Sequence, residues 1–137
     1  MMRYRVVFDT NIYISAILFG GVPEKVLNLA HSEVVDIFIS KQILAEIIKV
    51  LQFKFGWSRT QLAEVEAEIK RLTYKIDSKS KVKVVKSDPE DNKFLEAAIG
   101  SKSEFIISGD KHLLDLKSYK NIKIITAKTF FDLIGSY

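Results

Sequence analysis

Acidic residues follow two apolar segments of this 137-residue chain, where a buried strand would give way to a helix. Asp9 comes directly after the apolar run 6–8, and Asp110 comes shortly after a second run, 105–107. A third acidic group lies in the stretch SDPEDNKFLEAA, residues 87–98. In open α/β sheets, ligands gather beyond the carboxyl ends of the strands. The spacing therefore predicts that acids from these segments converge on one site.

Helix capping is the ordinary alternative for these acids. Asp is a common N-cap residue, and both Asp9 and Asp110 precede a candidate helix or helical turn. Thr10 and Asn11 could also cap the first helix, so the chain offers three capping residues where one is enough. Asn11 could instead support a carboxylate by hydrogen bonding. Ser108, two residues before Asp110, could bond a carboxylate or a substrate phosphate.

The acids of the third group do not all have the same explanation. Asp88 and Glu90 suit a helix start, because a cap and acids in the first turn are favoured there. Asp91 falls one turn before Leu95, on the side that must pack against the sheet, where a carboxylate needs a partner. Glu46 lies inside a separate helical segment, where it reads by itself as an exposed helical residue.

A cation would reconcile several carboxylates in one place. Two like charges roughly 4 Å apart repel by about 4 kcal/mol at an effective dielectric of about 20. The chain has no cysteine, and its two histidines, His31 and His112, are far apart in sequence and form no local motif. Oxygen-only ligands suit Mg²⁺ or Mn²⁺. Such an ion can orient a phosphodiester and activate water.

The elements that must position these acids follow from hydrophobic periodicity, caps and breakers. Expected strands cover residues 4–8, 34–39, 82–85, 105–108 and 122–125. Expected helices cover residues 10–19, 23–31, 41–54, 58–76, 88–100, 112–116 and 126–134. Alternation of strands and helices predicts an α/β fold of three layers, α/β/α, with a central parallel sheet of about five strands.

Composition places the chain, residues 1–137, as one globular domain with 47% apolar and 28% charged residues. The absence of cysteine excludes disulfides, thiolate zinc sites and a cysteine nucleophile. We expect a cytoplasmic protein, since the sequence shows neither a signal peptide nor a long apolar run. The formal net charge of +4 is compatible with nucleic acid. The densest basic run, 79–83, reads either as a solvated segment or as a nucleic-acid contact.

Five segments, in order, resemble the PIN-domain family, in particular its toxin-like members from bacterial and archaeal toxin–antitoxin pairs. They are VVFDTNIYISAIL (6–18), ISKQILAEIIKVL (39–51), DPEDNKFLEAAI (88–99), FIISGDKHLLDL (105–116) and IKIITAKTFFDLI (122–134). The resemblance implies a small α/β/α nuclease that cleaves single-stranded RNA with Mg²⁺ or Mn²⁺. It also implies a cleavage that leaves a 5′-phosphate and a 3′-hydroxyl on the products.

Carried over by position, the resemblance assigns four catalytic and metal-binding acids, Asp9, Glu46, Asp91 and Asp110. By the same alignment, Asn11 and Ser108 are supporting polar residues, with Ser108 replacing the commoner Thr. Basic residues near the site, Lys93 and Lys111, would steer the RNA backbone.

The resemblance also implies partners, a cognate antitoxin and a second copy of the chain. Helices 23–31 and 41–54 carry more apolar residues than one sheet face needs, and Phe53, Phe55 and Trp57 lie near a helix end. These residues predict a homodimer with exposed apolar surface that an antitoxin can cover.

Two rival functions remain open at this stage. A doubly wound phosphate-transfer or receiver domain also has an Asp after a strand, but it needs a Lys near the last strand. Lys123 and Lys128 do not fit that role cleanly. A module that only binds RNA or an antitoxin would not need the intact set of acids.

Overall fold

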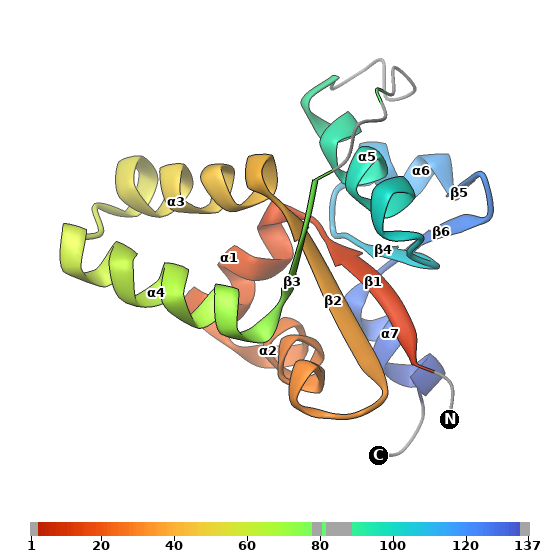
Figure 1. The fold of residues 1–137 in the computed structure, drawn as a ribbon, viewed down its shortest axis with the longest axis horizontal. Coiled ribbons are helices and arrows are strands. Elements are labelled where there is room, and N and C mark those ends of the chain that lie inside the picture. Colours follow the sequence, from red (N-terminus) through yellow and green to blue (C-terminus); the bar gives the residue numbers. More distant parts are fainter. Residues whose placement is uncertain (1–2, 78–80, 82–88, 135–137) are drawn as a thin grey trace.

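The computed structural model describes residues 3–77, 81 and 89–134 (Figure 1). The described strands are β1 (Tyr4–Phe8), β2 (Val35–Ser40), β3 (Tyr74–Ile76), β4 (Phe105–Ile107), β5 (Ser118–Tyr119) and β6 (Ile122–Ile125). The described α-helices are α1 (Thr10–Phe19), α2 (Gly21–Asn28), α3 (Lys41–Phe55), α4 (Arg59–Leu72), α5 (Asn92–Ser101), α6 (Lys111–Leu116) and α7 (Ala127–Ile134). Two short 3₁₀ helices are η1 (Leu29–His31) and η2 (Pro89–Asp91).

The strands form one sheet in the order β3-β2-β1-β4-β6-β5. All neighbouring pairs are parallel except β5 with β6. The order reverses around β1, because the chain moves from β1 to β2 and β3 on one side and then returns to β4 on the other. The carboxyl ends of β1 and β4 therefore lie side by side at such a reversal, where α/β folds bind their ligands.

Helices cover both faces of the sheet (Figure 1). α5 packs across β1, β2, β3 and β4 on one face, and α2 packs against α1 and α7 on the other. α3 leaves the sheet at the carboxyl end of β2 and returns as α4, so that the two helices project together beyond the β3 edge (Figure 1). The expected three-layer α/β/α fold with a mainly parallel sheet is confirmed.

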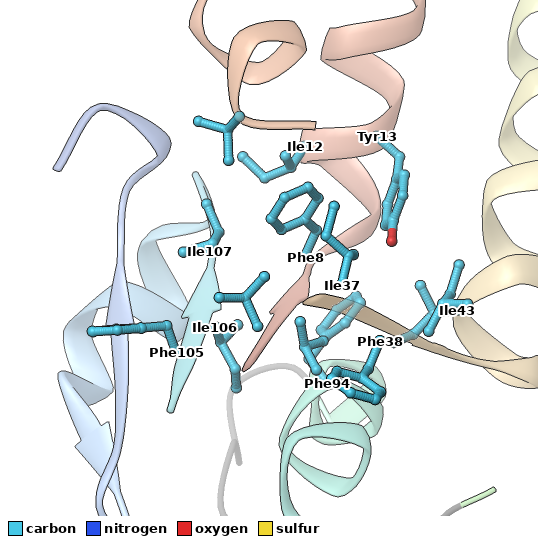
Figure 2. Close-up of a cluster of buried hydrophobic side chains, with 14 of the residues drawn as sticks. Phe8, Ile12, Tyr13, Ile37, Phe38, Ile43, Phe94, Phe105, Ile106 and Ile107 are labelled. Carbon is cyan, nitrogen blue, oxygen red and sulfur yellow. The ribbon is translucent and has the colours of Figure 1, made fainter. Parts of the chain in front are cut away.

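The core holds side chains from both faces of the sheet. Figure 2 shows Phe8 on the α1 side beside Tyr13, with their ring centroids 5.5 Å apart. Ile37, Ile106 and Ile107 come from the central strands and are fully buried. A buried strand that contacts helices on both faces has no polar face, which explains the continuous apolar runs in the sequence.

Side chains define several helix starts, because they satisfy the free N–H groups of the first turn. Ser58 and Gln61 form a capping box at the start of α4. Thr126 accepts a hydrogen bond from the Thr129 N–H at 3.1 Å before α7. At the other end of a helix, Gly56 stops α3 in the left-handed conformation (φ 67°).

The sheet differs from the expected one at both edges. The helix expected over 58–76 ends at Leu72, and the next residues form β3, with Tyr74 stacked 5.5 Å from the Phe38 ring. Pairing with β2 makes this segment a strand and not a helix, since its aromatic and β-branched residues fit an edge strand. β5 was not expected, and with it the described part of the chain has six strands in the sheet. The strand expected at 82–85 lies outside the described residues.

Smaller differences concern helix starts. α2 begins at Gly21, so Pro23 is its third residue, and the expected helix over 23–31 finishes as the 3₁₀ helix η1. The helix expected from residue 88 opens with η2 before α5. Within the described residues, no single helix is long and apolar enough to cross a membrane.

Candidate active site, an acidic pocket at the carboxyl edge of the sheet

A pocket of about 190 Å³ opens where β1 and β4 end. Its lining residues are Asp9, Thr10, Asn11, Glu46, Val50, Asp91, Phe94 and Asp110. All four predicted acids are present, although they come from four separate parts of the chain. The structure therefore brings together the carboxylates that the sequence predicted to converge.

Asp9 is held rigidly at the end of β1. It is 2% exposed and caps α1 by accepting a hydrogen bond from the Ile12 N–H at 2.9 Å. Its other oxygen accepts from the Ser108 hydroxyl, and the backbone N–H of Gly109 also donates to the carboxylate. Capping is thus a real role of Asp9, and it is compatible with a place in the pocket, because the same carboxylate caps α1 and lines the pocket.

Burial raises the pKa of Asp9 above its ordinary value of 3.8. The hydrogen bonds from Ser108, Ile12 and Gly109 oppose this rise because they favour the ionised form, and the nearby negative charge of Asp110 adds to it. The net rise shows that the hydrogen bonds do not fully compensate the Asp9 carboxylate for the water that burial removes. A cation in the pocket would supply that replacement and lower the pKa again.

Ser108 links the two strand-end acids. It is fully buried, donates to Asp9 and accepts from the backbone N–H of Asp110 at 2.9 Å. Asp110 in turn caps α6 by accepting from the His112 N–H at 2.8 Å. The supporting position assigned to Ser108 therefore has a geometric basis, since one hydroxyl fixes one acid directly and the other through its backbone.

Glu46 lies on the opposite side of the pocket and is already paired. The Lys93 ammonium lies 3.0 Å from its Oε2, and the Thr10 hydroxyl donates to its Oε1. Lys93 also donates to the Glu90 carbonyl at 2.8 Å, and its side chain is only 14% exposed. Sequence reasoning placed Lys93 near the site but took Thr10 only as a cap. The hydroxyl beside Asp9 was the one signal that could have drawn attention to Thr10.

The remaining predicted residues lie in the pocket wall or beside it. Asp91 is 7% exposed and stands where η2 passes into α5. Asn11 is exposed and lines the pocket, and Lys111 is exposed at the first position of α6, next to Asp110. Asp88 lies outside the described residues. Exposed polar groups beside a buried acidic floor leave room for a ligand to approach.

The donor set fits a hard divalent ion. All four ionisable side chains in the lining are carboxylates, which are ligands of Mg²⁺ and Mn²⁺. In the described part of the chain, no three His, Asp or Glu side chains are grouped as a ready cage for a metal. Mg²⁺ keeps several waters and needs only one or two direct carboxylates, so a dispersed acidic pocket suits it.

This combination of an α/β/α fold and an acidic pocket at the strand ends is that of a PIN-type nuclease. The chain belongs to the PIN domain family, whose model matches residues 5–112. PIN domains are generally nucleases, and they generally use divalent metals such as Mg²⁺.

Two relatives extend the comparison. The chain is 30% identical to an uncharacterized protein, MJ1680, of Methanocaldococcus jannaschii over 96% of this chain and 92% of that protein. The fold is similar to the crystal structure of PAE2754 from Pyrobaculum aerophilum, with a TM-score of 0.59 and 15% identity over 98% of this chain and 91% of the other. The first likeness shows a relative matched over nearly the whole of both chains, and the second supports the fold alone.

Proposed function

We propose that the protein is an endoribonuclease that hydrolyses phosphodiesters of single-stranded RNA with Mg²⁺ or Mn²⁺. The observation that carries this proposal is the convergence of Asp9, Glu46, Asp91 and Asp110 on one pocket. Membership of a family of nucleases supplies the reaction class. The cleavage would leave a 5′-phosphate and a 3′-hydroxyl, as the resemblance implies.

In this proposal, Asp9, Asp91 and Asp110 hold the metal, directly or through water. The bound ion would supply a polarised phosphate and an activated water. Ser108 would keep the Asp9 carboxylate oriented toward the pocket, since it already donates to that group. Glu46, steadied by Thr10 and Lys93, would complete the acidic wall and position the attacking water or a second ion.

The test is cleavage of a labelled single-stranded RNA by the purified full chain. Cleavage should appear with Mg²⁺ or Mn²⁺ and vanish with EDTA, and the product ends should be a 5′-phosphate and a 3′-hydroxyl. A duplex of the same sequence should be cut more slowly. Full activity after exhaustive chelation would sink the metal model.

The receiver-type alternative gains nothing from the structure. The two lysines considered for that role, Lys123 within β6 and Lys128 in α7, are both exposed and neither lines the acidic pocket. Lys128 instead pairs with Asp132 at 2.8 Å. A phosphoenzyme assay on Asp9 would separate this alternative from hydrolysis.

A cellular role as the toxin of a toxin–antitoxin pair is part of the same proposal. Three aromatic side chains support an apolar docking surface: Phe19 at the end of α1 is 79% exposed, and Phe53 and Phe55 near the end of α3 are 76% and 44% exposed. We propose that the protein acts in the cytoplasm as a homodimer that a cognate antitoxin covers. Light scattering that shows a monomer at every concentration would count against the dimer.

A further inference from the structure

A groove rich in lysine runs between α3 and α4. Its first part is a cavity of about 350 Å³ at the start of α3, lined by Ile39, Ser40, Lys41, Leu44, Lys70, Thr73 and Lys75. A second cavity of about 360 Å³ continues it along α3 and is lined by Lys41, Leu44, Ala45, Ile48, Lys49, Gln52 and Glu66. These two cavities are the lysine groove, and their linings share Lys41 and Leu44.

Positive charge in the groove is only partly balanced. Lys70 pairs with Glu66 at 3.0 Å, and among the described residues Glu66 is the only acid in either lining. Within the described residues, Lys41, Lys49 and Lys75 form no ion pair. Three lysines around a concave surface attract an anion more strongly than isolated surface lysines do.

Other features of the groove suit a nucleotide chain. Ser40 is 4% exposed, its oxygen accepts from the Ile43 N–H at 3.2 Å, and its hydroxyl donates in none of the hydrogen bonds among the described residues. Leu44 and Ile48 give the groove an apolar floor between the lysines. A strand of RNA offers phosphates for the ammonium groups and apolar faces of bases and sugars for such a floor.

The groove lies next to the acidic pocket. Both open where parallel strands end, because Ser40 closes β2 and Asp9 follows β1, its neighbour in the sheet. Glu46 follows Lys41 by five residues on α3, a rise of about 7.5 Å along the helix. Leu44 and Glu46 are set on different flanks of that helix by the turn of about 100° per residue. One strand could therefore cross the first turns of α3 and reach both sites.

We propose that the lysine groove binds the phosphate backbone of the RNA on one side of the bond that the acidic pocket cleaves. The proposal rests on the proposed function and extends it, because four carboxylates repel a polyanion and need a nearby basic surface to hold it. Net charge of +4 supports attraction of RNA to the molecule as a whole. An acidic segment of a partner protein is the other occupant that the test distinguishes.

The experiment compares Lys41→Gln/Lys75→Gln with the parent in binding a fluorescein-labelled single strand of about 12 nucleotides, a length within the range of known single-strand sites. Binding is measured by anisotropy in EDTA, where no cleavage occurs. The double variant should bind roughly tenfold more weakly at about 50 mM salt, and its plot of log affinity against log salt should flatten by about 0.7 for each lost phosphate contact.

A matched control removes the same charge elsewhere. Lys102 and Lys120 are exposed and precede β4 and β6, so they lie at the opposite, amino-terminal edge of the sheet. Lys102→Gln/Lys120→Gln should bind with the affinity and salt slope of the parent. An equal loss of RNA affinity in both double variants would overturn the proposal of a specific groove, because it would show only a general attraction of RNA to positive charge. Circular dichroism and melting checks that each variant folds.

Cleavage with Mn²⁺, run in parallel, separates this proposal from the proposed function. If the parent cuts RNA and the groove variant binds and cuts like it, the groove proposal is overturned and the nuclease stands. An occupant other than RNA, such as an acidic protein segment, would give this result. If groove lysines govern binding but nothing is cut, the groove stands and the nuclease proposal fails. Absence of any RNA binding by the parent overturns the groove.

Discussion

The two sides of the acidic pocket are built in different ways. On the strand side, Asp9 and Asp110 emerge from β1 and from the turn after β4, and each caps the helix that follows. On the helix side, Glu46 projects from α3 and is held by the side chains of Thr10 and Lys93. The strand side is held by backbone N–H groups and the Ser108 hydroxyl, while the helix side is held by side chains alone.

Charge differs between the sides as well. Asp9 has no cation beside it in the described structure; donors hold it, yet its pKa is raised by burial. Glu46 has the Lys93 ammonium at 3.0 Å. The strand side is therefore the side where a metal ion would relieve an unfavourable charge, whereas the helix side already contains its own counter-charge. This difference teaches that the four acids are not equivalent, although the sequence treated them as one set.

The largest expected effect comes from removing charge on the strand side. Asp9→Asn keeps the size of the side chain and an oxygen for capping, but removes a proposed metal ligand. Cleavage with Mn²⁺ should fall by at least about 100-fold, the scale on which one lost charge-stabilising group acts. The apoprotein should melt within about 1 kcal/mol of the parent, because relief of a buried charge offsets weaker bonds to Ser108 and Gly109.

Paired melts in EDTA and cleavage assays check this prediction. Asp115→Asn is a matched control, since Asp115 lies exposed on α6 and outside the pocket. An Asp9→Asn protein that melts normally and cuts at the parent rate would show that Asp9 is only a helix cap.

A smaller loss should follow from weakening the support of the strand side. Ser108→Ala removes the hydroxyl that donates to Asp9 and accepts from the Asp110 N–H. Loss of such a supporting bond typically lowers metal affinity or activity by about 10- to 100-fold. Ser108→Thr restores the hydroxyl and should recover most of the activity. Titration of each variant with Mn²⁺ measures the effect, and equal affinity in the parent and Ser108→Ala would contradict the proposed support.

Sequence reasoning recovers the strand side better than the helix side. The apolar runs before Asp9 and Asp110 are typical of buried strands, and parallel strands bring their carboxyl ends to one edge of the sheet. Residues far apart in the chain make the helix side, because Thr10 and Glu46 are 36 positions apart and Glu46 and Lys93 are 47 apart. The local sequence pattern does not predict such side-chain contacts, because they depend on how α1, α3 and α5 pack.

The edges of the sheet show the same limit. The helix expected over 58–76 would include Tyr74–Ile76, yet pairing with β2 and contact with the Phe38 ring make these residues β3. The short β5 depends on an antiparallel partner that its own two residues do not specify. In both places tertiary contact overrides local preference, which is a weak guide at sheet edges.

A change on the helix side should affect stability more than chemistry. Lys93→Met keeps the apolar stem of the side chain and removes the ammonium that pairs with Glu46. In EDTA the variant should lose about 1 kcal/mol, the scale of a partly exposed ion pair with its hydrogen bonds. Mg²⁺ should reduce the deficit if the ion can replace the missing counter-charge. Melts of both proteins with and without Mg²⁺ measure it, and a deficit that grows on adding the ion would contradict this view of the pair.

The smallest effect is a dependence of stability on pH that belongs to Asp9. Its folded pKa is raised above 3.8, so the folded protein holds this proton to higher pH than the unfolded chain does. The contribution of Asp9 to the free energy of unfolding is therefore complete below pH 3.8 and is lost as pH rises through the raised pKa. Asp9→Asn has no proton to lose at this position and gives the reference.

Melting the parent and Asp9→Asn in EDTA across the acidic range should show the parent losing stability relative to the variant as pH increases. A bound divalent ion favours the carboxylate form, so Mg²⁺ should abolish or reverse this trend in the parent. The comparison within one pair of proteins cancels most titration elsewhere in the chain. A parent that gains stability over Asp9→Asn with rising pH in EDTA would mean that the three hydrogen bonds outweigh burial, and that the strand side needs no metal to hold its charge.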